Sequence, residues 1–177
     1  MRRLQEQGKA RYIGITGYPL TLLARIAETV RVDTILTYCR YNLMVTDIDD
    51  VLTPAAKKHG TGLINASPLH MGLLTSRGAP DWHPASVEVR EASRKALEIC
   101  RKRGVALPDL ALRFCLVHPY VSTTLVGMSN QAHVKTNPNV LQMMTDLELV
   151  EKIRALVGPV LNYVWPSGRP ENHDATD

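Results

Sequence analysis

The alternation of short apolar runs with helical segments constrains the fold of this chain more than any other feature of its sequence. Four runs of apolar and β-branched residues, each closed by turn-forming residues, predict strands at 11–16, 34–38, 62–66 and 122–126. Apolar residues at helical spacing predict helices at 21–29, 49–59, 88–103, 109–117 and 147–156. Strands that alternate with helices are typical of βα units, whose strands form one parallel sheet.

Turn-forming residues agree with these boundaries. Pro19 stands at an N-terminal turn, and Gly60 and Gly104 stand where helices commonly end. A complete (β/α)₈ barrel needs about 200 residues or more, so a chain of 177 residues with four predicted strands holds about half of one. We therefore expect an α/β fold of about four βα units over residues 1–165, followed by a C-terminal tail at 166–177.

Composition excludes several classes of protein. The hydrophobic share of 45% and the charged share of 21% are ordinary for a globular protein and exclude disordered and fibrous chains. No apolar run approaches the roughly 18 residues of a membrane span, and charged residues stand where a signal peptide needs an apolar stretch. Cys39, Cys100 and Cys115 are too far apart for a redox or metal motif, so we expect reduced thiols and a cytoplasmic location.

The charge pattern does not favour a nucleic-acid partner or a metal. The net charge is +4, but the basic residues are scattered and aromatic residues make up only 5%, which predicts a solvated basic surface. The six histidines show no ligand spacing, so we expect no metal site. Neither of the usual glycine-rich phosphate loops is present.

The carboxyl ends of the predicted strands carry the candidate site, because ligands of parallel α/β folds bind there. These ends offer hydroxyl, amide and backbone donors at Thr16-Gly17, Tyr38 with Tyr41-Asn42, Ser67-Pro68-Leu69 and Gly127-Met128-Ser129. Two interpretations remain open: one shared ligand rim, or the turn chemistry that ends strands in every protein. In the long connection at 71–84, Trp82 and His83 either face the substrate or form a loop with a packed Trp and an exposed His.

Six segments of the sequence resemble, in order, the aldo-keto reductase family. They are GKARYIGITGYP, TYCRYN, INASPLHMGLLT, WHPAS, LALRFCLVHP and LVGMSNQAHVKTN. WHPAS and the late WPSG (165–168) are similar to the L-galactose dehydrogenase branch in particular. The resemblance covers nearly the whole chain but only the C-terminal half of the family's (β/α)₈ TIM barrel. It implies an NAD(P)-dependent oxidoreductase that oxidises an aldose such as L-galactose at C1 to a lactone.

The resemblance also implies which residues meet the nicotinamide end of the cofactor. Thr16 matches a position that contacts the carboxamide, although Gly17 stands where an Asn is usual. Tyr38 occupies the place of a Gln that binds the same carboxamide. Ala66 stands where many members stack a Tyr on the ring, which puts that stacking in doubt.

The rest of the cofactor would lie along two loops. The family pattern places the pyrophosphate along Ser67, Leu69 and Gly72. It places the adenosine end against Gly127, Ser129, His133 and Asn137. Gly127 replaces a Lys that often binds a 2′-phosphate, so NAD is favoured over NADP.

No residue of this chain is expected to be catalytic by the family mechanism. The family's Asp, Tyr, Lys and His come from the first four strands of its barrel, outside the resemblance, and no position here inherits them. Two other hypotheses stay open: a catalytically inactive half-barrel that binds a nucleotide or a partner, and a structural or regulatory module without chemistry. A half-barrel would have open edges at the strands 11–16 and 122–126, which would favour self-association.

Overall fold

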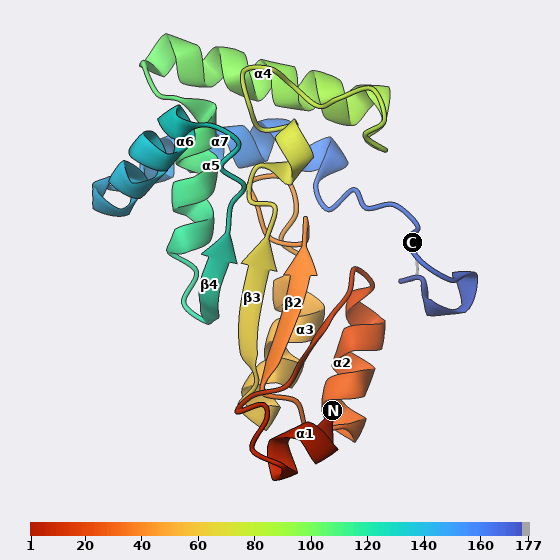
Figure 1. The fold of residues 1–177 in the computed structure, drawn as a ribbon. Coiled ribbons are helices and arrows are strands. Elements are labelled where there is room, and N and C mark those ends of the chain that lie inside the picture. Colours follow the sequence, from red (N-terminus) through yellow and green to blue (C-terminus); the bar gives the residue numbers. More distant parts are fainter. Residues whose placement is uncertain (175–177) are drawn as a thin grey trace.

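The computed structural model describes residues 1–174 and contains one parallel sheet with the strand order β1-β2-β3-β4 (Figure 1). The strands are β1 (Gly14–Thr16), β2 (Thr34–Tyr38), β3 (Gly62–Ala66) and β4 (Val121–Leu125). Consecutive strands are neighbours, so each connection through a helix adds one strand to the same edge of the sheet. The predicted α/β fold of four βα units is confirmed.

The helices of the described residues run beside and above this sheet. They are α1 (Arg2–Glu6), α2 (Leu20–Thr29), α3 (Ile48–His59), α4 (Val87–Arg103), α5 (Leu107–Leu116), α6 (Gln131–Thr136) and α7 (Leu147–Val157), with 3₁₀ turns at His70–Gly72, Asn137–Gln142, Gly158–Val160 and Pro170–Asn172. Side-chain hydrogen bonds and glycines with left-handed backbone explain where several of these helices begin or end. Ser86 accepts a hydrogen bond from the Val89 N–H at the start of α4. Gly60 and Gly104 end α3 and α4 in the left-handed conformation, as predicted.

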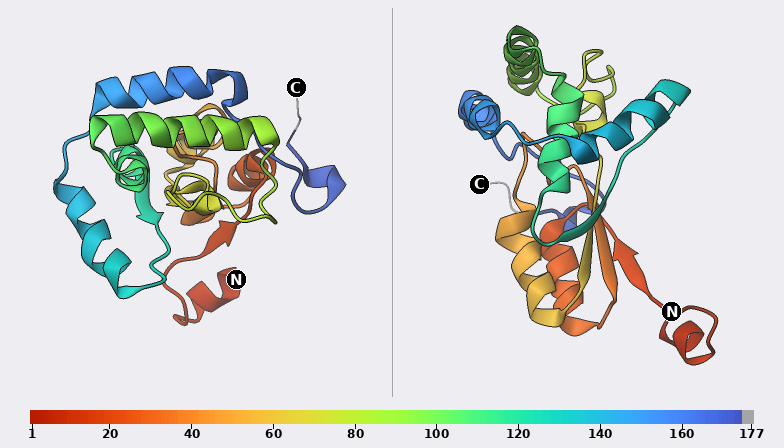
Figure 2. Two further views of the ribbon diagram at one scale, coloured as in Figure 1. Left: turned by 90° about the horizontal axis from the view of Figure 1, so that it is seen from above. Right: turned by 90° about the vertical axis from the view of Figure 1, so that its left-hand side faces the viewer.

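Within residues 1–174, the helices packed on the sheet, α2, α3 and α5, cover one of its faces. Figure 2 shows α2 and α3 on the same side, and α5 leads into β4 there. Burial in β2 and β3 alternates along each strand: Ile35 and Leu63 are fully buried against the helices, whereas Leu36 and Ile64 on the other face are only half-buried. A parallel sheet is usually covered on both faces, so the half-buried face is the one that a complete barrel would enclose.

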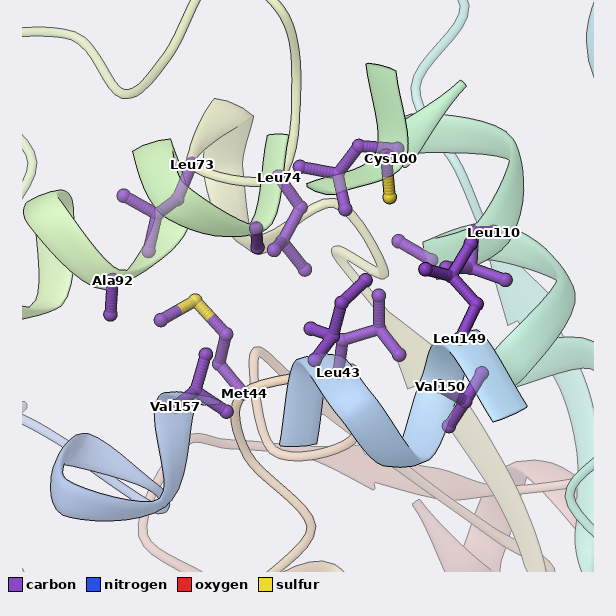
Figure 3. Close-up of a cluster of buried hydrophobic side chains, with 14 of the residues drawn as sticks. Leu43, Met44, Leu73, Leu74, Ala92, Cys100, Leu110, Leu149, Val150 and Val157 are labelled. Atoms are coloured by element: carbon purple, nitrogen blue, oxygen red, sulfur yellow. The ribbon is translucent and has the colours of Figure 1, made fainter. Parts of the chain in front are cut away.

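Two hydrophobic clusters hold these layers. The first lies between the sheet and α2, α3 and α5, and includes Leu23, Ile35, Leu52 and Leu63. The second lies above the carboxyl ends of the strands, where α4, α5 and α7 meet the loops that leave β2 and β3 (Figure 3). The β2 loop contributes Leu43 and Met44, and the β3 loop contributes Leu73 and Leu74, as the close-up shows. Apolar burial therefore anchors both loops at the end of the sheet where ligands bind.

The edges of the sheet differ from the predicted boundaries. The central strands β2 and β3 match the prediction, and β4 begins and ends one residue earlier than predicted. The strand predicted at 11–16 is shorter, because the Ile13 N–H donates to the Asp33 carboxylate at 2.8 Å and pairing begins only at Gly14. Apolar periodicity does not mark the short helix α6, because this helix buries no residue.

The segment predicted as a C-terminal tail returns to the sheet. The Asp174 carboxylate accepts hydrogen bonds from the Leu20 N–H at 3.0 Å and the Thr21 N–H at 2.9 Å, at the start of α2. The same carboxylate pairs with the buried Arg40 guanidinium at 2.8 Å. Residues 175–177 of the predicted tail lie outside the described residues. Among residues 1–174, no helix has the length and apolar character needed to cross a membrane.

Candidate functional site

A cavity of about 780 Å³ opens at the carboxyl ends of β3 and β4. Its walls come from the loop after β3, the start of α5 and the segment after β4. Sites for small organic ligands measure about 300–1,000 Å³, so the volume suits a cofactor or substrate. It lies where parallel α/β folds bind their ligands.

The wall from the β3 loop has a tightly constrained backbone. His70 and Met71 adopt left-handed φ values of 49° and 50°, and Gly72 follows with a φ of 100°. A Cβ on Gly72 would come within 3.3 Å of the Gly78 carbonyl oxygen, so glycine lets the loop fold back on itself. The buried side chain of Leu73 anchors this turn in the second hydrophobic cluster. Leu69 and Gly72 are thereby presented to the cavity.

The opposite wall is polar and open to solvent. Gly127, Ser129 and His133 are exposed there, and Asn137 is half-buried. The Asn130 side chain accepts a hydrogen bond from the His133 N–H at 3.0 Å, so the chain itself satisfies the first turn of the six-residue α6. Phosphate binding at this wall would therefore use side chains and loop N–H groups more than the helix start.

The donors of the cavity fit a nucleotide. Hydroxyl and amide groups face it from Ser76, Ser129, Thr136 and Asn137, and Arg77 adds a positive charge. Asp109 is the acidic residue of the lining, and burial raises the pKa of its carboxyl. Hydroxyls, amides and one guanidinium suit a ribose and a diphosphate. Within residues 1–174, no group of three His, Cys, Asp or Glu side chains could hold a metal ion.

The structure brings together part of the predicted cofactor set. The residues of that set that line the cavity are Leu69, Gly72, Gly127, Ser129, His133 and Asn137. Thr16 lies apart, exposed at the end of the edge strand β1. Tyr38 packs against Tyr18 with ring centroids 5.2 Å apart. Ser67 has a left-handed φ of 57° and lies beside the buried Cys39 thiol, whose pKa burial raises to about 11.

Sequence reasoning did not identify most of the wall contributed by the long connection. That wall adds Met71, Thr75, Ser76, Arg77, Gly78, Ala79, Pro80 and Trp82, with Pro108 and Asp109 from α5. Trp82 is 70% exposed and lines the cavity, whereas His83 is buried at 3% exposed. The open alternatives for this pair thus resolve into a third arrangement, with the Trp facing the cavity and the His packed. The length of the connection was the available signal, because long loops in compact folds are commonly functional.

Comparisons with known proteins agree with this fold. The sequence profile described as aldo/keto reductase family matches residues 1–157. L-galactose dehydrogenase of Arabidopsis thaliana is 40% identical over 179 residues, which cover 97% of this chain and 56% of that protein. D-arabinose 1-dehydrogenase of Saccharomyces cerevisiae is 29% identical over 191 residues, which cover 96% of this chain and 57% of that protein. The chain spans about half the length of the curated relatives it matches.

A solved structure gives the same picture of the fold. The holo form of the aldo-keto reductase AKR11C1 from Bacillus halodurans superposes with a TM-score of 0.71 at 22% identity. The match covers 93% of this chain and 53% of that one. The four βα units therefore correspond to half of an aldo-keto reductase barrel, as the resemblance implied. With the family profile matching 157 residues, this chain belongs to the aldo/keto reductase family.

Proposed function

We propose that this chain forms the cofactor-holding half of an NAD(P)-dependent aldo-keto reductase that oxidises an aldose such as L-galactose at C1 to a lactone. One observation carries the proposal: the cavity brings together six residues that the family resemblance assigns to the cofactor, from two loops far apart in the sequence. The similarity to L-galactose dehydrogenase supports the substrate class. The cofactor, when bound, would accept or supply the hydride.

The roles of the chain's residues follow from their places. Leu69 and Gly72 would lie along the pyrophosphate, and Ser129 and Asn137 would hold the adenosine end. His133 and Gly127 border the same end. Thr16, Tyr38 and Ser67, outside this cavity, would meet the nicotinamide end and the loop beside it. NAD is the proposed cofactor because Gly127 provides no positive charge for a 2′-phosphate.

The proposal assigns orientation to this half and proton transfer to the family's Asp, Tyr, Lys and His, which the resemblance places on the other half of the barrel. No residue of this chain is proposed as catalytic. A cytoplasmic setting is part of the proposal, and the three free, buried cysteines are compatible with it.

The test is nucleotide binding by the chain. NADH and NADPH are titrated while Trp fluorescence is followed, because Trp82 lines the cavity. We expect saturation with a Kd of about 1 μM to 1 mM, the range of typical cofactor and substrate affinities. Gly72→Ala should weaken binding at least about tenfold, because φ is 100° and the new Cβ would meet the Gly78 carbonyl.

Gly158→Ala is the matched control, since a Cβ there meets no atom within 4 Å, its φ is −42° and it does not line the cavity, so binding should be unchanged. Gly127→Lys should shift preference toward NADPH by about tenfold through a charge-assisted contact with the 2′-phosphate. Absence of saturable binding by the unaltered chain at millimolar nucleotide would refute the proposal.

A second candidate, an inactive half-barrel that pairs with itself or a partner, is favoured by the uncovered sheet. Leu36 and Ile64 on the open face are only half-buried, and β1 and β4 are the edges of the sheet described. Unpaired edges favour association with another chain. Sedimentation velocity should then show a concentration-dependent dimer, whereas a cooperatively folding monomer at all concentrations contradicts this candidate.

A further inference from the structure

Three buried residues behind the cavity wall are linked by hydrogen bonds. The His83 Nε2–H donates to the His70 carbonyl oxygen at 3.1 Å, and the His70 Nδ1–H donates to the Asn42 Oδ1 at 3.2 Å. The Ala85 N–H donates to His83 Nδ1 at 3.0 Å. These partners assign one tautomer to each ring. We call Asn42, His70 and His83 the histidine clamp.

The clamp joins three separate segments of the molecule. Asn42 belongs to the loop after β2, His70 to the loop after β3, and His83 to the connection before α4. The Asn42 Oδ1 also accepts from the N–H groups of Met44 and Val45 at 2.9 and 3.2 Å, which fixes its own loop. The clamp therefore ties the loop after β3 to two rigid supports, one on each side.

The segment held by the clamp has a strained backbone. His70 and Met71 both have left-handed φ values, a conformation that non-glycine residues keep only where surrounding contacts impose it. Leu69, Met71 and Gly72 line the cavity, but Asn42, His70 and His83 do not. The clamp acts on the cavity only through this backbone.

Both rings are buried and neutral. His70 is 1% exposed and His83 is 3% exposed. Burial lowers the pKa of His70 to about 3, with a smaller contribution from His83, and burial also lowers the pKa of His83. The Arg90 guanidinium, which donates to the His83 carbonyl at 2.7 Å, is the charged group beside them. The Trp165 ring lies 5.6 Å from both imidazoles and completes their cover.

We propose that Asn42, His70 and His83 are positioning residues, which hold the Leu69–Gly72 wall in the shape that binds the pyrophosphate of the nucleotide. This inference rests on the proposed function and extends it to residues that never touch the ligand. A merely structural clamp would change stability when removed. A positioning clamp also changes nucleotide affinity and the local motion of the wall.

The test compares disruptive and conservative variants of the full 177-residue chain. His70→Ala and His83→Ala remove one hydrogen-bonding side chain each. His70→Asn keeps a donor near the position of Nδ1 and tolerates the left-handed backbone. His83→Gln keeps a donor near the position of Nε2. His118→Ala is the matched control, a buried histidine that hydrogen-bonds Asp49 and the backbone of β4 and does not line the cavity.

Two measurements decide the outcome, the Kd for NADH and the hydrogen exchange of the amides of residues 69–75. We expect the two alanine variants of the clamp to raise the Kd about tenfold and to speed exchange, and the conservative variants to restore both to near the unaltered values. His118→Ala should lower the Tm without changing either. Alanine variants that lower the Tm but leave Kd and exchange unchanged would overturn the inference.

The two proposals fail in different ways. If the unaltered chain binds no nicotinamide nucleotide, the proposed function is wrong, and exchange at residues 69–75 still decides whether the clamp positions the wall. Faster exchange in both alanine variants, reversed in the conservative ones, then supports the clamp. Unchanged exchange overturns it.

Discussion

The segments that lead into the strands and those that leave them satisfy their polar groups in different ways. Before β2, the Asp33 carboxylate accepts from the Ile13 N–H at 2.8 Å and from Gln5 at 2.9 Å. Before β4, His118 donates to Asp49 at 2.7 Å and accepts from the Tyr120 N–H at 3.0 Å. Before β3, the left-handed position at the end of α3 is taken by a glycine, Gly60.

The segments that leave β2 and β3 contrast with this at each point. Besides the glycines Gly72 and Gly78, four residues other than glycine hold left-handed φ values there, namely Cys39, Ser67, His70 and Met71. In and after the same strands, and within the described residues, buried polar atoms without a hydrogen-bond partner include Thr37 Oγ1, Asn42 Nδ2, Asn65 Oδ1 and His70 Nε2. Strain and unsatisfied polar atoms concentrate at functional sites. The segments that lead into the strands, which we call strand entrances, thus satisfy their polar groups and stabilise the fold. The segments that leave the strands, which we call strand exits, keep strained backbone and unsatisfied polar atoms at the end of the sheet where ligands bind.

The largest expected effect is at a strand entrance. His118→Ala leaves the part-buried N–H groups of Tyr120 and Val121 and the Asp49 carboxylate without their partner. We expect a loss of about 3 kcal/mol in the free energy of unfolding, measured by urea denaturation. His59→Ala, at an exposed histidine of α3, is the control and should change stability little. If His118→Ala loses as little free energy of unfolding as the control, the strand entrances do not stabilise the fold in the way proposed.

Lowering the pH should destabilise the strand exits before the strand entrances. The folded chain holds the pKa of His70 at about 3 against its ordinary 6.5, so below pH 6.5 the unfolded chain binds a proton that the folded chain does not. Stability then falls as the pH falls, by about 2 kcal/mol between pH 7 and pH 5. His83 and Arg90 add to the cost of a positive charge there. Urea unfolding of His70→Asn at both pH values should show a clearly smaller loss, and an equal loss contradicts the assignment.

The segment after β1 is stabilised by a residue from the C-terminal end of the described chain. Asp174 binds the start of α2 just after β1 and pairs with Arg40 at 2.8 Å. Asp174→Asn should cost about 1.5 kcal/mol, through the lost cap and ion pair, in urea unfolding followed by Trp fluorescence. Glu171→Gln is the control, because Glu171 is exposed and lies 3.9 Å from the exposed Arg169. Equal unfolding midpoints for the two variants would show that the contacts of Asp174 do not stabilise the folded chain.

The smallest effects should have opposite signs at the two kinds of segment. Met71→Gly relieves a left-handed residue at an exit and should stabilise the chain by about 1 kcal/mol. Gly60→Ala introduces the same strain at an entrance, in open space, and should destabilise by about 1 kcal/mol. Thermal unfolding measures both. Changes of the same sign would mean that backbone strain is not what separates entrances from exits.

The predictable part of the fold is the part with strong local patterns. The strands at 34–38 and 62–66 were predicted to the residue, because each is a short run rich in apolar and β-branched residues that turn-forming residues close. The edge strand β1 is shorter than predicted because the Asp33 side chain takes the Ile13 N–H, which no pattern reveals. The helix α6 buries nothing and so has no apolar period to detect.

The site was predictable only where a family pattern existed. Leu69, Gly72, Gly127, Ser129, His133 and Asn137 were named from motifs and line one cavity. Trp82 and His83 are neighbours in sequence, yet one faces the cavity and the other is buried behind it. His83 is held in its buried place by contacts with His70 and Arg90, which the local sequence does not encode.

The order of the elements, the parallel sheet, the helix ends at Gly60 and Gly104 and the half-barrel length all follow from the local sequence. These depend on residues within a few positions of one another, whose spacing can be read directly. Only the tertiary structure decided which strand ends meet, how Asn42 reaches His70 across 28 residues, and how Asp174 reaches Thr21 across 153. Such contacts arise because burial brings distant segments together, and no local period records which partner each will find.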